Sequence, residues 1–425
     1  MRAIVFHGKG DIRLEDVEEP KIQDDNDAIV RLTTSAICGT DLHFVRGTFP
    51  GMVPGTILGH EGVGIVEKVG RGVRNLNVGD RVVVPSTICC GYCAYCRAGY
   101  FAQCDSANPN GKDAGTAFFG GPKSSGPIQG LQAERARIPF SNANLVKLPE
   151  EVTDDQAILI SDIFPTGYFA AEIAGLHEGC VVTVFGCGPV GQFAIASCKL
   201  MGAGRVIAVD NVPSRLETAR NQGAEVIDFD AEDPIEAIKE LTGGIGSDRA
   251  IDAVGIDASH PRSRTENFGA EESDRPLKKR GSGREPEQPV QRAGDAPAQA
   301  LEWAVQALAK AGTLSVVGVY PPQMDTFPIG KAMNKNLTLR MGNCNHRKYV
   351  PKLVEFVRAG VIDPTEVVTP LEPLGSAIDA YQAFDQHEPG WIKVELAPES
   401  LGVRKISRQS IRNVRSDEEG EAAAI

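Results

Sequence analysis

The chain has 425 residues, a net charge of −12 and a hydrophobic fraction of 42%. This length exceeds one ordinary core and fits two domains of usual size plus extra segments. The acidic charge disfavours binding to nucleic acid or to an anionic membrane surface. No apolar run of about 18 residues or more occurs, so a transmembrane helix is not expected. We therefore expect neither a nucleic-acid partner nor a membrane.

The cysteines and the N-terminus indicate a compartment. Residues 1–7 run directly into a strand-like pattern, without a charged and then apolar leader. Ten cysteines without such a leader favour a reducing environment, in which thiols are free to bind metal. The expected location is the cytoplasm.

Two regions of the chain differ in pattern. Up to about residue 148, short β-rich stretches broken by Gly, Pro and Asn predict a compact all-β domain with strands at 28–32, 64–69 and 81–84. After about residue 153, strands alternate with helix-length segments, at 181–185, 192–201, 206–210 and 214–222. This alternation predicts βαβ units, and hence an α/β fold with a doubly wound parallel sheet.

The later part of the chain contains an interruption. Residues 256–300 are rich in charged residues, Pro and Gly, and they predict a long insertion or mobile loop. A helix is expected at 304–311 and a strand at 313–319. Residues 400–425 carry an acidic run and are expected to be a disordered tail.

Four cysteines spaced two, two and seven residues apart predict a closed, structural zinc site, because four thiolates bind Zn²⁺ tetrahedrally: Cys90, Cys93, Cys96 and Cys104. Disulfide pairing is the competing interpretation, but a secreted framework would be expected with a leader. Cys89 adjoins the first ligand and makes the register ambiguous by one residue. Only Cys90 gives the even two-residue spacing.

A glycine-rich loop follows an expected strand and opens an expected helix, which is the context that a dinucleotide-binding turn requires: Gly186, Gly188, Pro189, Val190 and Gly191. Asp210 ends the next strand, where a carboxylate accepts hydrogen bonds from the adenosine ribose. A 2′-phosphate would meet like charge there, so NAD is favoured over NADP. Arg215 could pair with a phosphate, but we expect it against the adenine. Asp210 as a helix cap is the alternative.

Three further residues are expected at the cofactor because they end strands at the carboxyl edge of the parallel sheet: Val254, Gly318 and Val319.

A second group of metal-binding residue types is spread along the chain. Cys38, His60 and Asp162 offer a thiolate, an imidazole and a carboxylate. Three protein ligands leave zinc an open position for water or a substrate oxygen. Taken singly, the cysteine could be core, the histidine solvated and the aspartate a helix cap.

These motifs, in this order, resemble the zinc-containing medium-chain alcohol dehydrogenases, and most closely the glutathione-independent formaldehyde dehydrogenase branch. The matching stretches are C-G-[ST]-D-x-H at 38–43, G-H-E at 59–61 and S-D-x-x-P-T-G at 161–167. The resemblance covers roughly residues 1–397 without the insertion. It implies that Cys38, His60 and Asp162 hold the catalytic zinc. Glu61 would be a fourth ligand when water or substrate is absent, or a supporting carboxylate.

The same resemblance implies an architecture. Residues 1–152 and 342–399 would form a GroES-like β-rich catalytic domain with both zinc sites, and 153–341 a Rossmann domain that binds NAD. Each subunit would hold two zinc ions and assemble into a homotetramer or a dimer. The substrate would be a small alcohol or aldehyde, and formaldehyde would enter as its hydrate and leave as formate.

The resemblance also implies roles for residues around the zinc. Thr40 would accept the substrate proton and pass it through the nicotinamide ribose to His43, which would release it to solvent. Gly39 would contact the cofactor beside them. The loop 342–347 would return towards the cleft, where Arg347 could reach a phosphate.

Two alternatives stay open on sequence alone. One is a formaldehyde dismutase, in which tightly bound NAD alternates between its oxidised and reduced forms. The other is a non-catalytic, zinc-stabilised dinucleotide-binding protein, for which the open-site residues would have no use.

Overall fold

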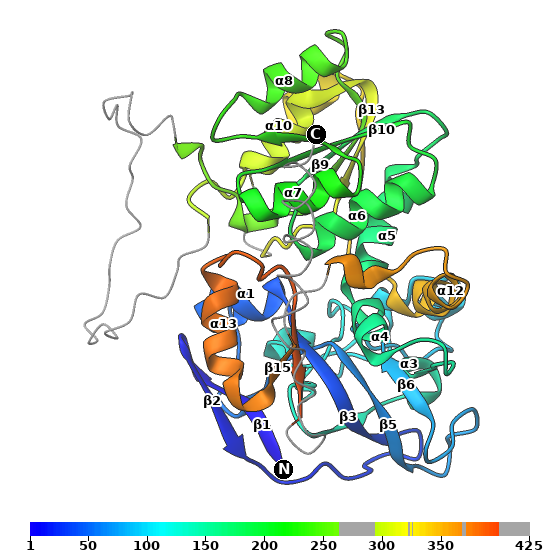
Figure 1. The fold of residues 1–425 in the computed structure, drawn as a ribbon. Helices are drawn as coiled ribbons and strands as arrows, with labels where there is room; N and C mark the ends of the chain where they lie inside the picture. Colours follow the sequence, from blue (N-terminus) through cyan, green and yellow to red (C-terminus); the bar gives the residue numbers. More distant parts are fainter. Residues whose placement is uncertain (263–293, 322–323, 325, 368–370, 399–425) are drawn as a thin grey trace, which may run out of the picture.

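The computed structural model describes residues 1–262, 294–321, 324, 326–367 and 371–398 (Figure 1). The expected tail 400–425 and most of the expected insertion lie outside the described residues.

A six-stranded parallel sheet forms one half of the molecule, in the order β11-β10-β9-β12-β13-β14. The order reverses between β9 and β12, which is the point where doubly wound sheets bind nucleotides. Its strands are β9 (Val181–Phe185), β10 (Arg205–Asp210), β11 (Glu225–Asp228), β12 (Ser247–Asp252), β13 (Leu308–Val316) and β14 (Thr338–Met341).

Helices cover both faces of this sheet. One apolar core packs the sheet against α8 (Pro234–Leu241) and α10 (Gln299–Ala307). The other packs it against α5 (Ile163–Ala174), α6 (Pro189–Leu200) and α7 (Pro213–Asn221). Two buried faces explain the nearly continuous apolar runs of the central strands β9 and β10, whereas the edge strand β14 is mostly exposed. The expected α/β fold with a doubly wound sheet is confirmed.

The other half is β-rich and draws on both ends of the chain. A seven-stranded sheet runs β15-β16-β3-β5-β6-β8, with β7 also on β3, and a three-stranded sheet runs β2-β1-β4. The strands are β1 (Arg2–Gly8), β2 (Asp11–Asp16), β3 (Ala28–Ile37), β4 (Thr56–Ile57), β5 (Gly62–Val69), β6 (Arg81–Val84), β7 (Arg135–Ile138), β8 (Val146–Lys147), β15 (Leu371–Pro373) and β16 (Val394–Ala397). The C-terminal segment thus returns to the N-terminal one (Figure 1).

The β-rich half and the junction also contain α1 (Gly39–Arg46), α2 (Ala94–Arg97), α3 (Ser141–Asn144), α4 (Asp154–Ser161), α12 (His346–Arg358) and α13 (Ala377–Asp385). Helix α11 (Ile329–Asn334) packs in the core of the parallel sheet beside α10. Helix α13 packs against α1 in one apolar cluster. Within the described residues no single helix is long and apolar enough to cross a membrane, although α4 and α5, which meet at a bend of 47°, reach that length and composition together.

Some expected boundaries are wrong. The helix expected at 304–311 ends at Ala307, and β13 begins at Leu308, because pairing with β12 overrides the helical preference of an Ala-rich stretch. Strand β12 ends at Asp252, so Val254 follows the strand instead of ending it. Likewise Gly318 and Val319 follow β13, which ends at Val316.

The expected insertion is too wide at both ends. Ile256 and Ala258 are buried, and α10 already begins at Gln299. The first and last residues of the expected insertion therefore belong to the packed structure, because apolar residues among them are buried.

Candidate metal centre and cofactor cleft

Three segments bring the second group of metal-binding residues together. Cys38 is the N-cap of α1, where its backbone N–H donates to the Asp41 carboxylate at 3.0 Å. His60 and Glu61 precede β5. Asp162 occupies the break between α4 and α5, with non-helical φ of −142° and ψ of −66°, and its side chain makes no capping hydrogen bond. The cap alternative for Asp162 is therefore not supported.

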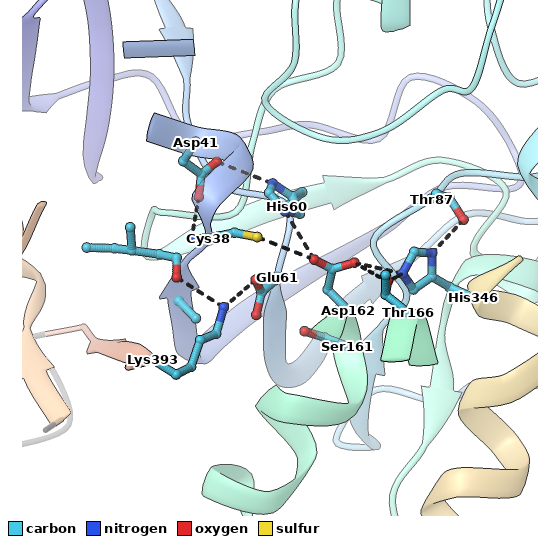
Figure 2. Close-up of polar contacts among 12 residues, drawn as sticks. Cys38, Asp41, His60, Glu61, Thr87, Ser161, Asp162, Thr166, His346 and Lys393 are labelled. Carbon is cyan, nitrogen blue, oxygen red and sulfur yellow. Dashed lines mark hydrogen bonds and ion pairs between the residues drawn. The ribbon is translucent and has the colours of Figure 1, made fainter. Parts of the chain in front are cut away.

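The spacing of the donor atoms fits a tetrahedral zinc ion. Oδ2 of Asp162 lies 3.6 Å from Sγ of Cys38 and 3.4 Å from Nε2 of His60 (Figure 2). Ordinary zinc bond lengths at tetrahedral angles put such pairs about 3.6 and about 3.4 Å apart. One ligand atom of Glu61 also lies within 4.8 Å of the others. All four side chains are buried.

Charged neighbours hold two of these residues. Nδ1 of His60 lies 3.2 Å from Oδ1 of Asp41. Lys393 is fully buried, and its Nζ donates to Oε1 of Glu61 at 2.5 Å and to the Ile37 carbonyl at 3.0 Å. The other oxygen of Glu61, Oε2, is buried without a hydrogen-bond partner among the described residues.

The electrostatics of this centre favour a cation. Burial raises the pKa of the Cys38 thiol. Burial lowers the pKa of His60, but Asp41 and Asp162 outweigh that effect and raise it well above its usual value. Burial raises the pKa of Asp162, but hydrogen bonds with His346 and His60 outweigh burial and hold it well below its usual value. A metal ion bound here would replace the imidazole proton.

His346 contacts this centre from the start of α12. Its Nε2 lies 2.7 Å from Oδ1 of Asp162 and 3.2 Å from Oγ1 of Thr166, and its Nδ1 lies 3.1 Å from Oγ1 of Thr87. Burial lowers the pKa of His346, but Cys344 and Asp162 outweigh it and raise the pKa to about 10.

The four clustered cysteines also meet in space. Sγ of Cys90 lies 3.9 Å from Sγ of Cys96, and Sγ of Cys93 lies 3.9 Å from Sγ of Cys104. Zinc–sulfur bonds at tetrahedral angles separate the sulfurs by about 3.8 Å. Cys89 is not one of the four, although it adjoins Cys96, and its Sγ lies 3.3 Å from Oδ1 of Asn144.

Backbone N–H groups support these sulfurs. The Cys93 amide donates to Sγ of Cys90 at 3.3 Å. The Cys90 amide donates to Sγ of Cys104 at 3.2 Å. Burial raises the pKa of Cys93, but the backbone of Cys96 and Asp105 outweighs it and lowers the pKa to about 7. A thiolate is thus accessible near neutral pH at Cys93. Contact with Cys89 raises the pKa of Cys96 and burial raises the pKa of Cys104, and a bound metal ion would favour the thiolate at both.

A cavity of about 300 Å³ lies between the β-rich half and the carboxyl edge of the parallel sheet. Most of the residues expected at the cofactor or in proton transfer line it: Cys38, Gly39, Thr40, His43, Gly186, Gly188, Pro189, Val190, Asp210, Arg215, Val254, Gly318 and Val319. Gly191, His60 and Asp162 are not among its lining residues.

The glycines of the turn fit a dinucleotide in different ways. Gly186 has a φ of +88°. A Cβ on Gly191 would lie 1.9 Å from the Gly186 carbonyl oxygen, so this position needs glycine for packing. A Cβ on Gly188 would meet nothing closer than Arg215 at 4.0 Å, so its absence leaves open space at the start of α6. That helix start can face a pyrophosphate.

Asp210 serves the turn as well as the cavity. Its Oδ2 accepts from the Cys187 amide at 2.7 Å, and its Oδ1 accepts from the amides of Asn211 and Val212. The N-cap of α7 is Val212, so Asp210 does not cap that helix; it holds the amides of two turns and lines the cavity.

His43 is more enclosed than expected. It is 3% exposed, with Nδ1 3.1 Å from Oγ1 of Thr48 and Nε2 3.7 Å from Oδ2 of Asp257. The Asp257 side chain is 33% exposed and also contacts Arg46. His43 and Asp257 both line the cavity, so the partly exposed Asp257 carboxylate lies beside the imidazole.

Comparisons with known proteins decide the family. Residues 24–150 match the alcohol dehydrogenase GroES-like domain, and residues 189–263 match the zinc-binding dehydrogenase domain. A zinc-type alcohol dehydrogenase-like protein of Bacillus subtilis is 39% identical over 402 residues, which cover 94% of this chain and 100% of that protein. The chain belongs to the zinc-type alcohol dehydrogenases.

Two more similar proteins support the assignment of this chain to the zinc-type alcohol dehydrogenases. The alcohol dehydrogenase from Thermus sp. ATN1 superposes with a TM-score of 0.77 at 34% identity, over 94% of this chain and 100% of that one. A glutathione-independent formaldehyde dehydrogenase of Pseudomonas aeruginosa is 39% identical over 270 residues, 60% of this chain and 66% of that protein. The resemblance inferred from the motifs is confirmed. The prediction that the chain is an oxidoreductase with a small-molecule substrate is confirmed as well.

Several site residues of this dehydrogenase escaped the sequence analysis. Asp41 lies inside the matched motif at 38–43 but was given no role. In the loop 342–347, His346 contacts the metal centre, whereas Arg347 does not line the described cavity. Lys393 had no local signal, because a lysine in a short strand-like segment reads as exposed.

Proposed function

We propose that the chain is an NAD-linked, zinc-dependent dehydrogenase that interconverts alcohols and aldehydes, with formaldehyde hydrate, oxidised to formate, as a substrate. The observation that carries the proposal is the tetrahedral spacing of Asp162, Cys38 and His60. Asp162 is the form of the third ligand that the formaldehyde dehydrogenase branch implies. The partial match to a formaldehyde dehydrogenase supports this substrate.

The protein side chains would divide the work as follows. Cys38, His60 and Asp162 would hold the catalytic zinc, with Glu61 beside it. When bound, zinc supplies a Lewis acid and NAD accepts the hydride. Thr40, on the cavity wall, would take the substrate hydroxyl proton and pass it on to His43.

His43 suits that task electrostatically. Burial lowers the pKa of His43, Asp257 raises it and Arg46 lowers it, so the net shift is downward and the imidazole is neutral at pH 7. A neutral imidazole can accept a proton. Asp257 would then be the neighbour through which the proton leaves.

NAD is proposed over NADP on charge. Asp210 stands on the cavity wall at the end of β10, and a 2′-phosphate beside it would face a carboxylate. Arg215 lines the same wall, and its guanidinium would attract a 2′-phosphate, so the affinities for NAD and NADP are to be measured side by side. The other proposed cofactor contacts are those on the wall given above.

The remaining proposals concern architecture and assembly. We infer a second, structural zinc at Cys90, Cys93, Cys96 and Cys104. The proposed catalytic domain comprises residues 1–152 and 342–399, and the Rossmann domain comprises 153–341. A homodimer or homotetramer is expected, which light scattering tests. All ten cysteines lie in the described part of the chain and none forms a disulfide there, which suits the reducing cytoplasm.

The test is NADH formation by the purified enzyme against primary alcohols, secondary alcohols and formaldehyde, each with and without glutathione. The proposal predicts glutathione-independent reduction of NAD by formaldehyde. Formaldehyde turnover without added NAD would identify a dismutase instead. No turnover with any substrate, in protein that carries both zinc ions and binds NAD, would favour a non-catalytic dinucleotide-binding protein.

A further inference from the structure

The two oxygens of Asp162 have different surroundings. Oδ2 faces the donor atoms of Cys38 and His60. Oδ1 faces the opposite way, towards Nε2 of His346 at 2.7 Å and Oγ1 of Thr166 at 3.4 Å (Figure 2). The carboxylate is therefore shared between the metal position and a histidine that comes from another part of the chain.

The His346 ring is itself held in place. Its side chain is 4% exposed, and its second nitrogen, Nδ1, lies 3.1 Å from the hydroxyl of Thr87. The adjoining residue Asn345 accepts a hydrogen bond from the Ala102 amide at 2.9 Å. The ring is thus held by Thr87 from the segment after β6, and the residue before it is tied to Ala102.

This arrangement has a consequence for a carboxylate ligand. A carboxylate can bind a metal through one oxygen or through both, and binding through both would occupy the position that a catalytic zinc keeps open. A histidine N–H on Oδ1 engages the lone pairs that the second bond would need. Partners of this kind set the orientation of metal ligands in general.

We propose that His346 is a positioning residue that holds Oδ1 of Asp162, so that the carboxylate binds the metal through Oδ2 alone and the fourth coordination position stays open. This inference rests on the metal centre proposed above. It assigns no direct contact between His346 and the substrate or the reacting atoms.

The test replaces His346 and measures the metal centre without turnover. In His346→Leu the N–H is lost, while His346→Gln keeps a donor near the position of Nε2. Zinc retention is measured against a chelator, and the visible spectrum is recorded after cobalt(II) replaces zinc. Lys348→Gln is the control, because Lys348 lies on the same helix and pairs with Glu172 at the surface.

The expected result is a loss of metal affinity of roughly 10- to 100-fold in His346→Leu, the range found for such supporting residues. Its cobalt spectrum should change, because the second oxygen of Asp162 would take the place of the exchangeable fourth ligand. His346→Gln and Lys348→Gln should match the wild type in both measurements. Wild-type affinity and an unchanged spectrum in His346→Leu would overturn the inference.

Two outcomes separate this inference from the proposed metal site. Should Asp162→Ala keep the affinity and spectrum of the wild type, the metal site itself fails. Should His346→Leu not fold, Thr87→Val decides, because it removes the partner of Nδ1 and keeps the ring. A several-fold loss of affinity is expected there, and affinity equal to the wild type in Thr87→Val would contradict the inference.

Discussion

The two metal-binding clusters differ in how the chain builds them. The four cysteines lie within residues 90–104, and backbone amides of the same loop support their sulfurs. The other cluster joins residues 38, 60 and 162, and its supporting contacts come from residues 346 and 393. A local loop can form the first cluster by itself, whereas the second exists only when both halves of the molecule have folded.

They also differ in what they leave open. Four sulfurs complete a tetrahedron, so the first cluster suits a structural ion. The second presents one sulfur, one nitrogen and one carboxylate oxygen next to the cavity that Cys38 also lines. The contrast predicts that damage to one cluster reduces stability, while damage to the other reduces activity.

Asp162→Ala should give the largest effect on activity. Loss of the carboxylate should remove the catalytic ion, and kcat/KM should fall by about 10³-fold or more, since zinc contributes several kcal/mol to the reaction barrier. Steady-state kinetics and metal analysis measure this. The cysteine cluster should keep its zinc. Wild-type kcat/KM in Asp162→Ala would contradict the assignment of activity to the cluster of Cys38, His60 and Asp162.

Cys96→Ser should act on stability instead. Loss of one sulfur from a closed site should lower the free energy of unfolding by more than about 4 kcal/mol, the range in which loss of a metal falls. Chemical denaturation measures this change. Cys198→Ser is the matched control, because Cys198 is also buried but lies outside the cluster. Equal stability of Cys96→Ser and wild type would show that the cluster holds no structural ion.

A pair of glycines sharpens the same contrast within the cofactor turn. Gly191→Ala should cost about 3 kcal/mol of stability, because its Cβ would overlap the Gly186 carbonyl. Gly188→Ala should fold normally and weaken NAD binding roughly tenfold, because its Cβ would point into open space where the pyrophosphate is proposed. Thermal unfolding and NAD titration of both variants separate the two effects. A stability loss in Gly188→Ala with weaker NAD binding in Gly191→Ala would contradict the proposed pyrophosphate site.

His43→Gln should give the smallest effect, visible in the pH dependence of stability. The pKa of His43 is lowered in the folded protein from its usual value of 6.5, so the unfolded chain binds more protons just below pH 6.5. This contribution to stability is present above pH 6.5 and is lost as the pH falls.

Denaturation at pH 7.5, 6.5 and 5.5 (about one unit on either side of the free value) measures that loss. The stability of wild type relative to His43→Gln should decline towards acid pH. The exposed His177→Gln is the control and should follow the wild type. A difference that grows on acidification would have the wrong sign for a lowered pKa.

The same contrast explains what could be predicted from the sequence. The cysteine cluster follows from spacing, because its ligands and its geometry lie in one loop. The change from short strands to alternating strands and helices predicted both halves of the fold. Cys38, His60 and Asp162 were singled out by motifs of a family, since nothing local shows that residues so far apart meet.

The supporting residues were beyond such reasoning. His346 lies 184 positions from Asp162 and Lys393 lies 332 positions from Glu61, so only the tertiary structure pairs them. The helix expected at 304–311 failed for a related reason, since strand pairing with β12 decides the state of Leu308. Local sequence preferences yield wherever long-range contacts dominate.

A crystal structure with anomalous diffraction at the zinc absorption edge would test the central claim most directly. The account predicts two peaks per chain, one among the four cysteine sulfurs and one bound by Cys38, His60 and Asp162, the last through a single oxygen. A single peak at the cysteine cluster, or a second ion held by both oxygens of Asp162, would contradict it.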